Sequence, residues 1–251
     1  MDDRDAHLEI PVEGIDWCTR QPYPEAVLED VVEVDLDWWN DRLANRQIPA
    51  QVSGRTVDGN QVWKGKAFIR RGDLEPGVPG LEMGEEPEFD RLYMCAAWLA
   101  EHPSRGGNRR FVDIREPQSG RRFEAVERAL IACRSAPGLF EASAYRDWSG
   151  WPTAPGVGHS LMSLYCWAIG RGGDRPQLLD NDSAGSLTWH GWMVASSVST
   201  YSVRRYVRYN ALIHRWARSA SVQPELVEMW LNRDWQIRLA ETTRRRDGSA
   251  L

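Results

Sequence analysis

The residues whose types and spacing could support chemistry lie between positions 139 and 187. A turn with the sequence Pro-Gly-Val-Gly (155–158) precedes an apolar stretch. Its two glycines permit unusual backbone dihedrals, and a helix starting after them would present unpaired N–H groups and the positive end of its dipole. The turn is therefore suited to holding an anion such as a phosphate, and an ordinary turn is the alternative. The candidate contacts are Gly156, Val157, Gly158, His159 and Ser160.

Asp180 is the candidate catalytic carboxylate, because it follows Leu178 and Leu179 directly. A carboxylate flanked by apolar residues is costly to bury without a partner, so it should either cap a helix or serve a site. The two roles are compatible, since a cap fixes the orientation of the carboxylate. Asp182 is a competing carboxylate, whereas Asp174 lies in a Gly/Arg loop where we expect it to be solvated.

Aromatic and basic side chains near this segment could take part in a nucleic-acid site. Stacking a base on an aromatic ring is worth about 1–3 kcal/mol. Burial in the core and a merely solvated basic face are the alternatives for these side chains. The base-pocket candidates are Trp151, Trp167 and Trp189, with Trp192 nearby, and the phosphate candidates are Arg204, Arg205 and Arg208.

Helical patterns dominate the chain that must position these residues, and the sequence predicts a mainly α fold. Apolar spacing and proline punctuation give the helix limits, and the Asp-Gly pair at 58–59 predicts a β-hairpin turn. The expected helices span about 32–43, 87–102, 122–134, 139–148, 159–169, 201–217 and 224–239, with a β-hairpin in 51–71 and a short strand at 111–114.

The loop at 72–86 is the best candidate for a boundary, because it contains Gly and Pro without periodicity. We therefore divide the chain into an N-terminal segment (1–86) with a short helix and a β-hairpin, a helical domain (87–240) and a flexible tail (241–251). Two helical lobes are expected to enclose a cleft with Asp180 beside it.

Composition sets broader limits. The net charge is −5, which disfavours nucleic acid as a partner only weakly, because a local basic face can bind phosphate. Of the 31 basic residues only Lys64 and Lys66 are lysine. No apolar run is long enough to span a membrane and no export signal is apparent, so a cytoplasmic location is expected. The four cysteines are scattered without metal-ligand spacing, and we expect reduced, buried thiols and no metal or iron–sulfur cluster.

The pattern of a Pro-Gly-Val-Gly turn, a helix, a turn and Leu-Leu-Asp resembles the helix-hairpin-helix DNA glycosylase superfamily. The helix-hairpin-helix itself would lie at about 139–169, and Asp180 follows Gly158 by 22 positions. The stretches RGGDRPQLLDNDSAGSL (Arg171–Leu187), FIRRGDL (Phe68–Leu74) and DLDWWNDRL (Asp35–Leu43) further resemble bacterial 8-oxoguanine DNA glycosylase-fold proteins linked to antiviral defence.

The resemblance implies that the protein binds double-stranded DNA, everts a modified or damaged nucleotide and hydrolyses its N-glycosidic bond. Asp180 would stabilise the oxocarbenium character of the sugar and could orient the attacking water. It implies no organic cofactor, but by resemblance a monovalent cation would be held at the hairpin. Members that also cut the strand use a lysine where this chain has Ser160, so we expect an enzyme without lyase activity.

Two other function classes stay open from the sequence. The fold could serve as a catalytically inactive DNA-binding or base-sensing module, or as an interaction subunit of a defence complex with a protein partner. A Ser/His hydrolase built on His159 and Ser160 is set aside, because the chain has no GxSxG nucleophile elbow.

Overall fold

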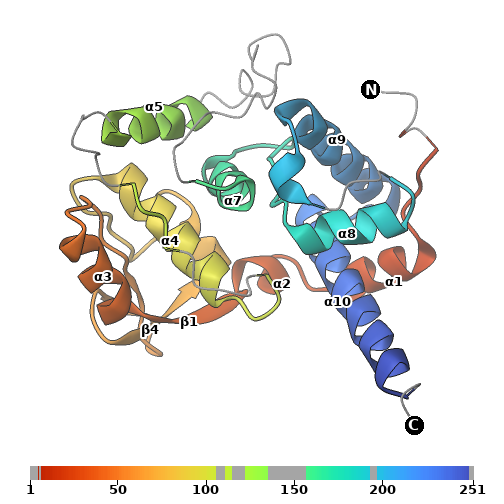
Figure 1. The fold of residues 1–251 in the computed structure, drawn as a ribbon, viewed down its shortest axis with the longest axis horizontal. Coiled ribbons are helices and arrows are strands. Elements are labelled where there is room, and N and C mark those ends of the chain that lie inside the picture. Colours follow the sequence, from red (N-terminus) through yellow and green to blue (C-terminus); the bar gives the residue numbers. More distant parts are fainter. Residues whose placement is uncertain are drawn as a thin grey trace.

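The computed structural model is mainly helical with one small sheet (Figure 1), which confirms the predicted fold class. It describes residues 5, 7–105, 111–114, 122–134, 157–192 and 197–248. Within these ranges no helix has the length and apolar character needed to cross a bilayer. The helices are α1 (Val12–Arg20), α2 (Glu25–Leu28), α3 (Leu36–Asn45), α4 (Pro87–Glu101), α5 (Arg122–Arg134), α7 (His159–Ile169), α8 (Asn181–Trp189), α9 (Val203–Ala220) and α10 (Pro224–Gly248), with 3-10 turns η2 (Arg71–Leu74) and η3 (Val198–Thr200).

The sheet is antiparallel with strand order β1-β4-β2-β3. The predicted hairpin corresponds to β2 (Gly54–Arg55) and β3 (Gln61–Val62), and Gly59 in its turn has a φ of 83°. Beyond the hairpin, β4 (Lys66–Arg70) pairs along its whole length with β1 (Val31–Asp35).

The expected helix at 32–43 is wrong in its first turn, where the structure has β1. Val32 and Val34 are buried whereas Val31 and Glu33 are exposed, which is the period-two alternation of a strand with one covered face. The helix begins at Leu36, because the Asp35 side chain caps it by accepting a hydrogen bond from the Trp38 N–H at 3.0 Å.

The structure differs from the expected elements at two further places and does not describe a third. Residues 111–114 are not a strand, and the Val112 carbonyl instead accepts a hydrogen bond from the Tyr93 hydroxyl. α10 continues to Gly248, well past the predicted end at 239 and through the predicted tail. The expected helix at 139–148, Trp151 and most of the hairpin, including Gly156, lie outside the described residues.

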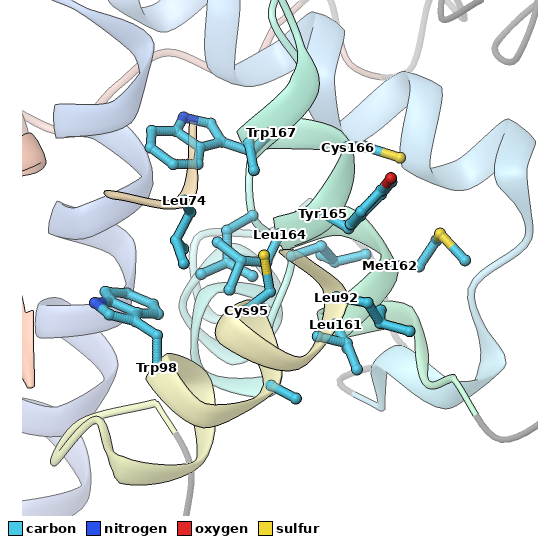
Figure 2. Packing of buried hydrophobic residues seen from close by; sticks show 14 of the residues in the cluster. Leu74, Leu92, Cys95, Trp98, Leu161, Met162, Leu164, Tyr165, Cys166 and Trp167 are labelled. Atoms are coloured by element: carbon cyan, nitrogen blue, oxygen red, sulfur yellow. The ribbon is translucent and has the colours of Figure 1, made fainter. Parts of the chain in front are cut away.

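A large part of the buried apolar core lies between α4 and α7 (Figure 2). α4 is buried along most of its length, because the sheet, α5, η2 and α7 all pack against it. α7 is apolar all round and lies between α4 and the α8–α9 group (Figure 1), which is the position expected of a fully buried helix. The cysteines are free and buried, as predicted, and burial raises the pKa of the Cys95 thiol to about 12.

α10 packs against α8, α9 and α1 (Figure 1). Gly185 lets α8 approach it closely, since a Cβ at that position would lie 2.5 Å from the Trp235 ring. Gly14 of α1 packs on the Trp230 ring in a similar way, since a Cβ there would lie 3.0 Å from the indole carbons. These close contacts hold α10 against α8 and α1.

Candidate active site

Asp180 is the N-cap of α8, in an extended conformation with φ −121° and ψ 172°. Its Oδ1 accepts a hydrogen bond from the Ser183 N–H at 2.7 Å, which satisfies one of the free donors of the first helical turn. The cap fixes the side-chain torsions of the carboxylate. The capping alternative is therefore correct for Asp180, and it leaves open a role in chemistry.

The second oxygen of Asp180 is held by two side chains from elsewhere in the chain. Oδ2 accepts from Arg105 Nη1 at 2.9 Å and from Asn232 Nδ2 at 3.1 Å. A carboxylate offers about four acceptor positions. Three of them are used by donors among the described residues, and the one that remains open is on Oδ1. Asp180 is only 3% exposed, so this carboxylate is dry as well as rigid.

Arg105 joins Asp180 to a buried row of alternating charges. Its Nη1 also contacts Glu228 Oε1, and Glu228 Oε2 pairs with Arg71 Nη1 at 2.8 Å. The row Arg71–Glu228–Arg105–Asp180 has no net formal charge, which is the condition for burying such groups. Although burial opposes the charged form, Glu228 and Asp180 hold the pKa of the Arg105 guanidinium above its usual range.

The turn after α4 presents Arg105 to this row. His102 hydrogen-bonds through Nε2 to Asp30 Oδ1 at 3.1 Å, and its Nδ1 accepts from the Ser104 N–H at 3.2 Å. These two bonds specify the Nε2-protonated tautomer if the imidazole is neutral. The imidazole opposes the effect of burial on Asp30 and lowers the pKa of that carboxyl group, with smaller contributions from Arg105 and Arg71.

A polar stripe on α10 supplies the remaining contacts. Glu228, Asn232 and Gln236 recur every fourth residue and therefore face one side of the helix. Asn232 bridges Asp180 and the Ser104 carbonyl, and Gln236 Nε2 donates to Asp182 Oδ2 at 2.5 Å. The sequence interpretation missed these residues and Arg105. The signal available was the i, i+4, i+8 run of polar residues in a helix otherwise expected to pack.

The structure brings the hairpin helix and Asp180 together. Ser163 Oγ of α7 donates to the Ser160 carbonyl and accepts from the Leu179 N–H, each at 2.9 Å, so α7 fixes the residue next to Asp180. His159 Nδ1 donates to the Val198 carbonyl at 2.8 Å, and the Val198 N–H donates to Asn181 Oδ1 at 3.0 Å. The first turns of α7 and α8 are therefore linked through η3.

Gly158 is the exposed N-cap of α7 and has no side chain to cover the helix N-terminus. Its φ of −77° is ordinary, so the unusual-dihedral argument does not apply to Gly158. A Cβ built there would meet no atom of the described residues within 4 Å, so none of these residues covers the first N–H groups of α7 on that side. Val157, His159 and Ser160 are partly exposed next to it. Most of the hairpin to which a monovalent cation was assigned by resemblance lies outside the described residues.

The tryptophan candidates behave differently from one another. Trp167 is fully buried, its indole N–H donates to Glu225 at 3.2 Å, and guanidinium groups of Arg71 and Arg175 cover its ring at 4.3 and 3.8 Å. These contacts favour the core alternative over base stacking. Trp189 is 64% exposed at the far end of α8 from Asp180, with Arg238 over its ring. Trp192 is buried.

The three basic candidates on α9 also differ in their contacts and exposure. Arg208 forms a two-bond pair with Asp5 at 2.7 and 2.8 Å, which removes it from the set expected to contact phosphate. Arg205 lies over the Tyr201 ring, and Arg204 is exposed.

The two other acidic candidates, Asp174 and Asp182, differ in their burial. Asp174 is exposed in its loop, as predicted. Asp182, at the second position of α8, is partly buried, and burial together with the charge of Asp180 raises the pKa of its carboxyl group. Within the described ranges, no group of three or more His, Cys, Asp and Glu side chains has the arrangement of a metal site.

Comparison with known proteins assigns the chain to a family. Residues 25–232 match the model of the family described as "Putative 8-oxoguanine DNA glycosylase OGG-like protein", and this range includes the whole row from Arg71 to Asp180 and reaches Asn232. No curated protein and no solved structure matches the chain. Since the family model covers most of the sequence, the chain belongs to this family of 8-oxoguanine DNA glycosylase-like proteins.

Proposed function

We propose that the protein is a monofunctional DNA N-glycosylase that hydrolyses the N-glycosidic bond of an everted modified or damaged base. The observation that carries this proposal is the setting of Asp180. A capped, buried and oriented carboxylate, with one acceptor position that no described residue fills, stands next to the hairpin helix of a chain from a glycosylase-like family.

The chemistry needs a fixed negative charge beside the sugar. As the bond between C1′ and the base nitrogen breaks, positive charge develops on C1′ and the ring oxygen. A pre-oriented carboxylate in a dry site stabilises that charge without reorganising, and the effect of such groups is commonly 100- to 1,000-fold in rate. Asp180 takes this role, and the open N-terminus of α7 at Gly158 holds the backbone phosphate of the same strand.

Strand cleavage is not part of the proposal. A lyase step requires an amine that forms a Schiff base with the sugar, and the position that carries lysine in such enzymes is Ser160. The two lysines of the chain, Lys64 and Lys66, lie on the turn and strand that follow β3. Borohydride should therefore trap no covalent complex with abasic DNA, and a trapped adduct on the protein would contradict the monofunctional assignment.

The direct test is excision from a panel of duplexes, each with one modified base, together with DNA from phages that carry modified bases. Alkali treatment converts each abasic site into a strand break, which gels resolve. Asp180→Asn should lose at least about 100-fold in single-turnover rate, while Asp174→Asn, a change at an exposed carboxylate, should match the wild type. Equal rates for Asp180→Asn and the wild type would remove Asp180 from the mechanism.

A second function, base sensing without cleavage, is favoured by one observation. Asp180 is ion-paired with Arg105 at 2.9 Å and is nearly inaccessible, which suits a structural carboxylate. If this function holds, the wild type binds modified duplexes but forms no alkali-labile sites. The role in defence against phages belongs to the proposal too, and a plaque assay with cells expressing wild-type or Asp180→Asn protein tests it.

A further inference from the structure

The start of α8 carries two carboxylates in different settings, one deep and one near the surface. Asp180 is buried and accepts three hydrogen bonds from Ser183, Arg105 and Asn232. Asp182 is only partly buried, and its one hydrogen bond from a described residue comes from Gln236, which is exposed. Of the two carboxylates, Asp182 is therefore the more accessible to water.

We propose that Asp182 accepts the proton of the attacking water, so that Asp180 serves only to stabilise the sugar cation. This inference rests on the proposed function and divides its two tasks between two residues. In the reaction, the C1′–N bond breaks and its electron pair leaves with the base nitrogen. The water oxygen forms the bond to C1′, and the water proton passes to an Asp182 oxygen and then to solvent or to the released base.

The hydrogen bonds place the two carboxylates in different surroundings. Every donor on Asp180 is an N–H group, and one of them is a guanidinium, so its charge is held in place for the cation. Among the described residues, Asp182 has a single donor, the neutral amide of Gln236, and it lies beside the negative charge of Asp180. Two neighbouring carboxylates with different surroundings commonly divide into a charge stabiliser and a proton-transfer group.

The surroundings of Asp182 determine when it can act as a base. The charged groups that act on it are Asp180, from the same helix start, and Arg105, from the turn after α4, while α10 faces it with the uncharged Gln236. Burial is the largest influence, followed by Asp180, and both raise the pKa of this carboxyl group, against Gln236 and Arg105. A raised pKa makes the ionised form a stronger base, and excision should increase with pH as Asp182 loses its proton.

An independent feature of the same helix turn points to a bound water or hydroxyl. Ser183 follows Asp182 and donates its N–H to Asp180, and its side chain is fully buried. Within the described part of the chain, its Oγ has no hydrogen-bond partner, and neither has Nε of Arg105. Buried polar atoms rarely stay unsatisfied, so a buried water bonded to Ser183 Oγ or to Arg105 Nε would complete the polar contacts beside Asp180.

The test compares single-turnover excision and DNA affinity for Asp182→Asn, Asp182→Glu and the matched control Asp174→Asn. Asp182→Asn should be about 100- to 10,000-fold slower with an unchanged Kd, the range found when a proton-transfer group is removed. Its rate should no longer increase with pH, Asp182→Glu should recover part of the rate, and the control should match the wild type. A urea midpoint equal to that of the wild type shows that the variants are folded.

Gln236 gives a second test that leaves both carboxylates in place. Gln236→Leu removes the donor and should move the rise of the pH–rate profile to higher pH, whereas Gln236→Lys adds a positive charge and should move it lower. An Asp182→Asn variant with full rate and an unchanged profile, or Gln236 variants that shift nothing, would overturn the role of Asp182 alone. A wild type that forms no abasic sites in any substrate would overturn the proposed function and this inference with it.

Discussion

Replacing Arg105 with Met tests whether the buried row of charges exists in solution. The side chain of Arg105 is 2% exposed and contacts Asp180 and Glu228. Met fills a similar volume without a charge, so the variant leaves two buried carboxylates with less compensation. Removing one partner from a buried ion pair typically costs about 3–5 kcal/mol.

The structure places the expected loss at the lower end of that range. Glu228 keeps Arg71 as a counter-ion at 2.8 Å, and Asp180 keeps the Ser183 N–H and the Asn232 amide. We therefore expect a loss of about 3 kcal/mol in the free energy of unfolding. For a chain of this size that corresponds to a melting temperature lower by roughly 6–12 °C.

Urea unfolding at pH 7 measures this loss, with Arg20→Met as the matched control. Arg20 forms an exposed pair with Asp16 at 3.7 Å, in which the two side chains are 76% and 60% exposed, so its loss should stay within about 0.5 kcal/mol. The double variant with Asp180→Asn should lose less than the sum of the single changes, because it removes the uncompensated charge as well. Equal midpoints for Arg105→Met and Arg20→Met would refute the buried row.

Three further predictions concern single side chains. Gly185→Ala should cost about 1–3 kcal/mol in urea unfolding, because the new methyl group overlaps the Trp235 ring, whereas Gly173→Ala has open space and should change little. Asp234→Asn should destabilise the protein near pH 7, and the difference from the wild type should disappear in strong acid. Hydrogen bonds lower the pKa of Asp234 despite its burial, and a lowered folded-state pKa contributes stability above the unfolded value, near pH 4, that is lost as the pH falls. Gly158→Ala should keep the stability of the wild type but weaken binding to duplex DNA in a titration, since the methyl group has room yet covers open N–H groups.

Local sequence signals were sufficient for most helices. α4 begins with Pro87, a residue that is common in the first turn of helices. α9 is capped by Ser202, whose side chain accepts a hydrogen bond from the Arg205 N–H. Both signals can be recognised from the sequence alone. The strand β1 was missed because alternation over five residues runs directly into a capped helix. Its partner β4 lies more than thirty positions away, so no local signal identifies the pairing.

The candidate site shows the same difference between local signals and contacts that are distant in sequence. The capping role of Asp180 follows from its neighbours and was open to sequence reasoning. Its partners were not, because Arg105 and Asn232 are 75 and 52 positions away from it. Trp167 shows the converse error, since a tryptophan next to a motif gives no indication of whether its ring faces a ligand or the core.

Contacts in the core explain part of the high arginine content. All but two of the 31 basic residues are arginines, and three of these arginines form contacts inside the protein. Arg71 and Arg175 lie over the ring of Trp167 while pairing with carboxylates, and Arg105 pairs with two carboxylates through one nitrogen. A planar, weakly hydrated guanidinium can stack and pair at once, whereas a lysine ammonium cannot. The residues that hold Asp180 in place therefore belong to the stability of the fold as much as to its chemistry, and the site and the core cannot be varied independently.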